Sequence, residues 1–260
     1  MTNAHGEFIW YQLMTSDPDA AEAFYADVVG WQIAPAGMGE MDYRILSAPD
    51  GQGIGGLMAL PAGAGGAPGW HGYIGVDDVD ATAEAVAAAG GTVHMPPATM
   101  DGVGRIAMLG DPQGTIFYVM RGASPEPSRA FACSQDAGPG HVVWNELTAA
   151  DPDAAIAFYA ARFGWGQEGA MPMGDLGDYR FLQAGDLAIG AVMGRMPGGQ
   201  DGWLPYVLVD DIDAAVERLR AGGGTLLDGP HEIPGGSFSL VANDPQGARF
   251  GLVGARQKEG

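Results

Sequence analysis

Apolar and polar positions along the chain predict strands and helices in a repeated order. The first apolar run, FIWYQLM at residues 8–14, has the length and composition of a strand. Asp17 and Pro18 then predict a helix start, because aspartate can accept hydrogen bonds from free backbone amides and proline at the first helical position loses none. Apolar residues four positions apart share one face of this helix, and Gly30 supplies the left-handed conformation that ends it.

The rest of the first half continues with short apolar segments that predict more strands and a second helix, which begins at Asp78. The predicted strands are YRILS (43–47), GIGGLMAL (53–60) and HGYIGV (71–76) before this helix, and TVHMP (92–96), RIAMLG (105–110) and TIFYVM (115–120) after it. Antiparallel strands with helices on one face predict an α+β fold. A curved sheet of this kind leaves a cup on its uncovered face.

The whole pattern occurs twice. DPDAAEAFYADVVGW at 17–31 returns as DPDAAIAFYAARFGW at 151–165, with eleven of fifteen residues identical, and further segments match at offsets of 133 to 136 residues. We therefore predict a tandem duplication with one domain at residues 1–121 and a second at 141–256. Residues 122–140, rich in Ser, Pro and Ala, are predicted to form a linker. Each domain is expected to hold two βαβββ modules.

Composition narrows the possible partners. The 260 residues carry 32 acidic and 12 basic side chains, a net charge of −20, which disfavours nucleic acid and favours either solubility or attraction of a cationic ligand. The sequence contains no run of eighteen apolar residues, so it predicts no membrane span. The N-terminus has no signal-peptide pattern, and we therefore expect a cytoplasmic protein. The single cysteine, Cys133, cannot form an intrachain disulfide.

Several repeated motifs together resemble those of the vicinal oxygen chelate superfamily, which includes glyoxalase I, extradiol dioxygenases and bleomycin-resistance proteins. They are D-P-x-A-A-x-x-F-Y-x-x-x-x-G-W, the helix entry V-D-D-[VI]-D-A, the strand entry A-G-G-T, and the D-P-Q-G turn before the last strand. The resemblance covers nearly the whole chain, once in each half. The chain as a whole is similar to tandem glyoxalase-like proteins. The resemblance implies a small-molecule site in the cup of each domain, while superfamily members differ widely in activity.

The resemblance also implies where a divalent metal would be held, namely on the first and last strands of each module. In the first half these positions are Trp10, Gly56, His71 and Tyr118, and in the second half Trp144, Ala191, Leu204 and Gly251. Only His71 is a conventional ligand, with Tyr118 a poor second. We therefore expect no cofactor, with a divalent metal as the less favoured case.

Aromatic residues take the place of the missing ligands, and such residues with a few polar groups are typical of small-molecule sites. We expect His71 to act as a general acid or base, with Tyr118 or Tyr73 donating a hydrogen bond to a developing oxyanion. The expected substrate-binding residues are Trp10, Gln12, Tyr43, Arg44, Trp70, Tyr73, Trp144, Glu146 and Tyr206. The alternative for the two Tyr–Arg pairs, 43–44 and 179–180, is a structural role in which each Arg is tied to an Asp.

Three functional hypotheses remain open from the sequence. The first is metal-independent binding or conversion of a planar or aromatic compound. The second is a metal-dependent lyase, isomerase or dioxygenase that uses His71 with Tyr118 or Glu146. The third is that the second half is purely structural, since Leu204 and Gly251 occupy implied ligand positions. We expect a monomer or homodimer, and we expect the remaining histidines (His5, His94, His141 and His231) to be solvated or capping residues.

Overall fold

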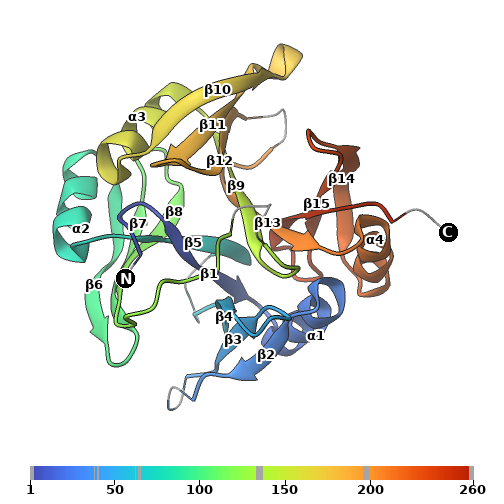
Figure 1. Cartoon of the computed structure of the whole chain (residues 1–260). Helices are drawn as coiled ribbons and strands as arrows, with labels where there is room; N and C mark the ends of the chain where they lie inside the picture. The colour runs from blue at the N-terminus through green and yellow to red at the C-terminus, as the bar shows by residue number, and fades with distance from the viewer. Residues whose placement is uncertain are drawn as a thin grey trace. The chain divides into compact units, whose positions relative to one another are not determined.

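The protein folds into four βαβββ modules, as the duplicated pattern predicts (Figure 1). The computed structural model describes residues 3–37, 39, 41–61, 63, 66–132, 137–195 and 199–257. The first two modules are β1 (Phe8–Thr15), α1 (Pro18–Val29), β2 (Gln32–Pro35), β3 (Tyr43–Ser47), β4 (Gly53–Ala59), and β5 (Gly69–Gly75), α2 (Val79–Ala88), β6 (Thr92–Met100), β7 (Gly104–Gly110), β8 (Ile116–Gly122).

The second half repeats this order with one additional 3-10 turn. Its elements are β9 (Val142–Ala149), α3 (Pro152–Phe163), β10 (Gly166–Pro172), η1 (Gly174–Leu176), β11 (Asp178–Ala184), β12 (Leu187–Gly194), β13 (Gly202–Val209), α4 (Ile212–Ala221), β14 (Thr225–Glu232), β15 (Phe238–Asn243) and β16 (Arg249–Gly254). The strands β1 and β5, which open the first two modules, are predicted from their apolar runs. The strand β2 has no counterpart among the predicted strands.

The strands form two eight-stranded mixed sheets with identical topology. Their hydrogen-bonding orders are β2-β3-β4-β1-β5-β8-β7-β6 and β10-β11-β12-β9-β13-β16-β15-β14. Within a module the last strand pairs with the first in parallel, as β4 does with β1, and the other pairs are antiparallel. Each helix packs on strands of its own module, which leaves one face of the module without a helix. We call this the helix-free face; together, these features confirm the α+β fold.

Local sequence signals account for the helix boundaries. Asp17 and Asp151 each accept a hydrogen bond from the amide three residues on, with a proline next in sequence at the start of the helix. Asp78 caps α2 in the same way, and Asp211 caps α4. Gly30 ends α1 with a φ of 85°, a left-handed conformation that costs glycine little.

Contacts divide the chain into two compact units, and each unit contains segments of both sequence halves. The first unit comprises Met1–Trp10, His71–Ser128 and Trp144–Leu204, and the second comprises Tyr11–Trp70, Arg129–Val143 and Pro205–Gly260. In Figure 1, the first unit places α2 beside α3 and the second places α1 beside α4. The chain passes from one unit to the other at five places, and one of them, between Ser128 and Arg129, lies within the predicted linker.

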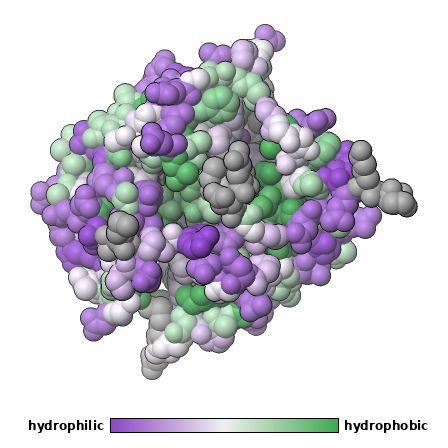
Figure 2. All heavy atoms as spheres, viewed as in Figure 1, coloured by the Kyte–Doolittle hydropathy of each residue, from purple (hydrophilic) through white to green (hydrophobic). Residues whose placement is uncertain are grey.

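The core combines aliphatic residues with aromatic residues of the repeated motifs. Phe24, Trp31, Phe158 and Trp165 are buried, which agrees with their predicted core role. Polar residues cover much of the face drawn in Figure 2, and apolar residues reach it in smaller patches. In the part of the chain that the structure describes, no helix is long and apolar enough to cross a membrane.

Candidate functional site

The first unit brings three predicted site residues of the first half together. Tyr73 on β5 and Tyr118 on β8 are directly paired, and their rings stack with centroids 4.3 Å apart and an interplanar angle of 3°. His71, two residues before Tyr73 on the same face, approaches Tyr118 edge-on with centroids 6.2 Å apart. Trp10 is half-buried on β1 in the same unit. The aromatic rings thus provide flat surfaces beside one imidazole.

His71 is poised to remain neutral. Burial lowers the pKa of its imidazole to about 4, because removing water disfavours the charged form. The side chain is half-buried, so it keeps contact with solvent. A neutral imidazole can accept a proton or a hydrogen bond, which agrees with a role as a general base.

The first unit also holds a hydrogen-bonded chain made from residues of the second half. Trp144 Nε1 donates to Tyr179 Oη over 2.7 Å, and Tyr179 Oη donates to Glu146 Oε2 over 3.0 Å. Phe181 meets the rings of both Trp144 and Tyr179 at steep angles. Burial, followed by the nearby Glu146 charge, raises the pKa of Tyr179 well above its usual value, so the hydroxyl keeps its proton and donates a hydrogen bond to the carboxylate.

Tyr179 and Phe181 are absent from the residues predicted to bind substrate. For Tyr179 and Arg180 a structural pair was the alternative, and it fits the arginine, whose guanidinium pairs with Asp153 on α3. Strand alternation from Arg180 places Tyr179 and Phe181 on the helix-free face. The period of two was therefore a signal that could have identified them.

The second unit holds two tyrosines that lie on glycines at implied ligand positions. The ring of Tyr43 covers Gly56, where an added Cβ atom would lie 1.9 Å from the phenol oxygen. Tyr206 covers its directly paired neighbour Gly251, where a Cβ atom would lie 2.3 Å from the ring. Gln12 is buried, and its amide donates to the carbonyl of Leu13 over 3.1 Å.

Two other residues predicted to bind substrate, Arg44 and Trp70, lie on the helix side of the sheet. Arg44 points to the helix side and donates to Asp42, Asp19 and Glu22, and these partners, Asp42 foremost, raise its pKa. Trp70 is buried and donates from Nε1 to Tyr25 Oη over 2.9 Å. Both side chains contact residues of α1 and not the helix-free face, where a binding role was expected. For Arg44 this agrees with the structural alternative.

The residues at the implied ligand positions do not fit a divalent metal. Among the described residues, no group of three or more His, Cys, Asp and Glu side chains is arranged to hold a metal ion. Two of the four implied last-strand positions are the glycines covered by Tyr43 and Tyr206, and the other two are Tyr118 and Ala191. His71 is the one strong donor at any of the eight implied positions, and one imidazole does not make a site.

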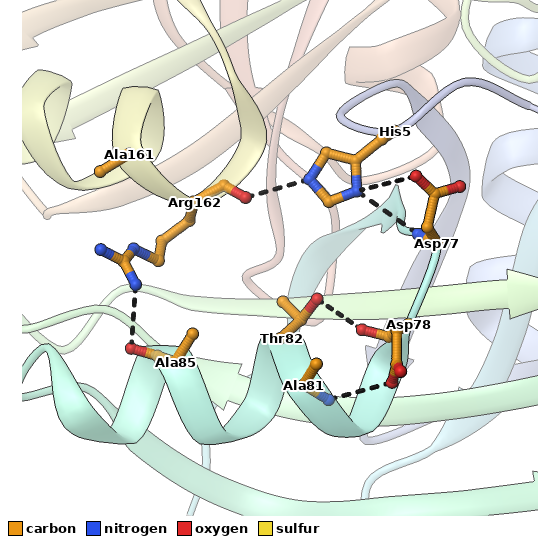
Figure 3. Close-up of a pocket in the computed structure, with 8 residues that line it drawn as sticks. All are labelled: His5, Asp77, Asp78, Ala81, Thr82, Ala85, Ala161 and Arg162. Atoms are coloured by element: carbon orange, nitrogen blue, oxygen red, sulfur yellow. Dashed lines mark hydrogen bonds and ion pairs between the residues drawn. The ribbon is translucent and has the colours of Figure 1, made fainter.

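A shallow pocket lies elsewhere in the first unit (Figure 3). Its volume is about 260 Å³, and it is lined mainly by α2 and the end of α3. Figure 3 shows His5 between the Arg162 carbonyl and Asp77, and Arg162 donating to the Ala85 carbonyl. His5 pairs with Asp77, and none of the predicted site residues lies in the pocket.

The remaining histidines and the cysteine differ in burial. His141 is 2 % exposed, and its ring nitrogens face the Arg129 carbonyl at 2.7 Å and Asp50 at 3.1 Å. The expectation of a solvated residue is therefore wrong for His141, because two acceptors replace its water. His94 and His231 are exposed. Cys133 lies outside the described residues.

The protein has clear relatives. The family model described as Glyoxalase/Bleomycin resistance protein/Dioxygenase superfamily matches residues 7–118 and 138–252. The chain is 34% identical over 251 residues to CFP32 of Mycobacterium tuberculosis, whose name links it to glyoxylases, covering 94% of this chain and 93% of the relative. It is 31% identical over 274 residues to the anthracycline biosynthesis protein DnrV of Streptomyces peucetius, covering 98% and 95%.

Solved structures share the fold at low sequence identity. The 2,3-dioxygenase LapB from Pseudomonas sp. KL28 has a TM-score of 0.64 and 13% identity, covering 100% of this chain and 95% of that one. The Mn(II)-bound glyoxalase from Novosphingobium aromaticivorans has a TM-score of 0.62 and 20% identity, covering 98% and 83%. The family match extends over both halves of the chain. This protein therefore belongs to the Glyoxalase/Bleomycin resistance protein/Dioxygenase superfamily.

Proposed function

We propose that this protein binds or transforms a planar or aromatic small molecule on the helix-free faces of its sheets, without a resident metal ion. The observation that carries the proposal is the covering of Gly56 and Gly251 by Tyr43 and Tyr206. These rings occupy the space into which a ligating carboxylate would extend. Aromatic surface has replaced metal-binding groups at the same positions.

Partial exposure of the aromatic residues supports access for a ligand. Trp10, Tyr43, Trp144 and Tyr179 are half-buried, whereas Phe24 and Phe158 on the helices are buried. A flat ligand can stack on such rings, and each ring contact adds favourable energy beyond the area it buries. The relatives named for glyoxylase and anthracycline biosynthesis are compatible with small-molecule chemistry of this kind.

Within the first half, His71 is the residue we assign to proton transfer. Its neutral imidazole can take a proton from a bound ligand, and the hydroxyl of Tyr118 or Tyr73 can donate to an oxygen that gains negative charge. Loss of turnover in His71→Ala, with ligand binding retained, is the expected result for any compound that the protein converts. Undiminished turnover in this variant removes His71 from the role.

Tryptophan fluorescence tests the binding proposal directly. Titration with a panel of aromatic metabolites should give saturable quenching by at least one compound, and Trp10→Phe or Trp144→Phe should remove the signal for the half that binds. Equal quenching loss in both variants would show that both halves bind. If no panel member gives saturable quenching, the proposal fails.

The alternative is a metal-dependent lyase, isomerase or dioxygenase with unusual ligands. The approach of His71 to Tyr118 is the observation that favours it, and the structural neighbours include a Mn(II)-bound glyoxalase. Elemental analysis of protein purified without an affinity tag separates the two cases. Stoichiometric Fe, Mn, Ni or Zn that is lost in His71→Ala supports the alternative and contradicts metal independence.

A further inference from the structure

The two halves share a tryptophan and a tyrosine on their helix-free faces, but the residues beside them differ. Sequence alignment of the repeats pairs Trp10 with Trp144 and Tyr43 with Tyr179. Strand pairing places Ile45, Gly56 and Gln12 side by side in the first half. It places Phe181, Ala191 and Glu146 side by side in the second.

The methyl group of Ala191 accounts for the different positions of the two tyrosines. Tyr43 lies on Gly56 in a place that any Cβ atom would exclude, since the atom would be 1.9 Å from the phenol oxygen and 2.1 Å from the ring carbon that bears it. Ala191 has such a Cβ atom, so Tyr179 cannot lie on the strand in the same way. The hydroxyl of Tyr179 hydrogen-bonds to Trp144 and Glu146.

The consequence is a carboxylate held in place among aromatic rings. Tyr179 donates a hydrogen bond to Glu146, and Trp144 donates one to the Tyr179 hydroxyl and so fixes its orientation. Glu146 is half-buried, so its charge is less screened than on the open surface. A carboxylate can accept about four hydrogen bonds, and the rings of Trp144 and Phe181 attract cations through their faces.

We propose that the second half binds a planar organic cation, with Glu146 as the group that selects the charge and Ala191 as the residue that positions Tyr179 to hold it. This inference rests on the proposed small-molecule function and assigns its ligand class to one half. It gives the second half a binding role, in place of a purely structural one. The net charge of −20 attracts the same class of ligand from solution.

Three probes of the same shape test the selection. They are 2-naphthamidine, which is cationic at pH 7, 2-naphthamide, which is neutral, and 2-naphthoate, which is anionic. Affinities are measured by equilibrium dialysis in about 0.15 M salt, where long-range attraction is screened. The amidine should bind about tenfold more tightly than the amide, as one hydrogen bond to a charged group predicts, and the naphthoate more weakly than either.

Two variants and a control assign the effect to the site. Glu146→Gln installs the residue that the first half has at this position, and it should bring the amidine and amide to similar affinities. Ala191→Gly keeps the charge and lets Tyr179 settle on the strand, so it should reduce the preference for the amidine. Glu84→Gln, on the exposed side of α2, removes the same charge and should leave the preference unchanged.

The outcomes separate this inference from the proposed function. Equal affinity for amidine and amide in the wild type, or an unchanged preference in Glu146→Gln, refutes the cation site while binding itself remains. An equal loss of preference in Glu84→Gln also refutes it, because overall charge would then be the cause. Failure of all three probes and of the aromatic panel refutes the proposed function and this inference together.

Discussion

The hydroxyl of Tyr25 donates a hydrogen bond to Asp244 over 3.1 Å, although 219 residues separate them in the chain. Trp70 Nε1 in turn donates to Tyr25 Oη over 2.9 Å. The first unit repeats this arrangement with Trp203, Tyr159 and Asp111. Each tyrosine comes from the repeated helix of one half, and each aspartate opens the D-P-Q-G turn of the other. The two motifs therefore recur because each copy completes the buried network of its counterpart.

Replacing Tyr25 by Phe should destabilise the protein by about 1–3 kcal/mol, because it removes one hydroxyl from a buried network without leaving a large cavity. Asp244, 3 % exposed, would keep its bonds from the amides of Gln246 and Ala248 and lose the one from Tyr25. Urea unfolding followed by circular dichroism measures the change. Tyr159→Phe is the matched variant in the other unit and should show a similar loss; no loss in either variant would contradict the role of this network.

His71 should make the protein less stable as the pH falls from about 6.5 to about 4. Burial lowers the pKa of His71 to about 4 from an ordinary value of 6.5, so in this range the unfolded chain binds a proton that the folded chain does not. Replacing His71 by Gln should flatten the pH dependence of the unfolding free energy over this window. His94→Gln, at an exposed position, serves as control, and an identical pH profile for wild type and His71→Gln would show that His71 does not titrate in this way.

Replacing His141 by Phe should cost about 1–3 kcal/mol, because the ring contacts two buried or partly buried acceptors that would lose their donor. The amide of Gln52 and, after it, His141 lower the pKa of Asp50, so the carboxyl should titrate at a higher pH in the variant. Urea unfolding measures the first effect and carbon NMR of the Asp50 carboxyl the second. His231→Phe changes an exposed histidine and should stay within about 0.5 kcal/mol of the wild type.

Alanine at Gly251 should be more damaging than alanine at Gly56. In both cases the new Cβ atom would collide with a tyrosine ring, at 2.3 Å for Tyr206 and 1.9 Å for Tyr43. Tyr206 is buried at 7 % exposure and has little room to move, whereas Tyr43 is half-buried and can rotate outward. We expect a loss of about 1–3 kcal/mol for Gly251→Ala, as is usual for overpacking, and a smaller loss for Gly56→Ala in urea unfolding. The reverse order would contradict these ring positions.

The local part of the fold could be predicted from the sequence. The helix caps at Asp17 and Asp151, the terminating Gly30 and the strand order of each module depend on neighbouring residues, and the motifs that encode them are written in full in both halves. The strand β2 was missed because its four residues, Gln32–Pro35, carry no alternation strong enough to identify it. Of the expected site residues, those placed by strand alternation, such as His71 with Tyr73, do share a face.

The sequence by itself thus determined four modules and their duplication, and it shows that most positions implied by the resemblance carry no conventional metal ligand. Only the tertiary structure decided which modules share a compact unit, and that Arg44 and Trp70 contact α1. It also decided that Tyr179 hydrogen-bonds to Glu146, and that Tyr43 lies on Gly56. The physical reason is that hydrogen-bond capping and strand alternation act over a few residues. The position of a long side chain depends instead on the volume and donors of residues that are distant in the chain, and there a single methyl group, that of Ala191, is enough to change it.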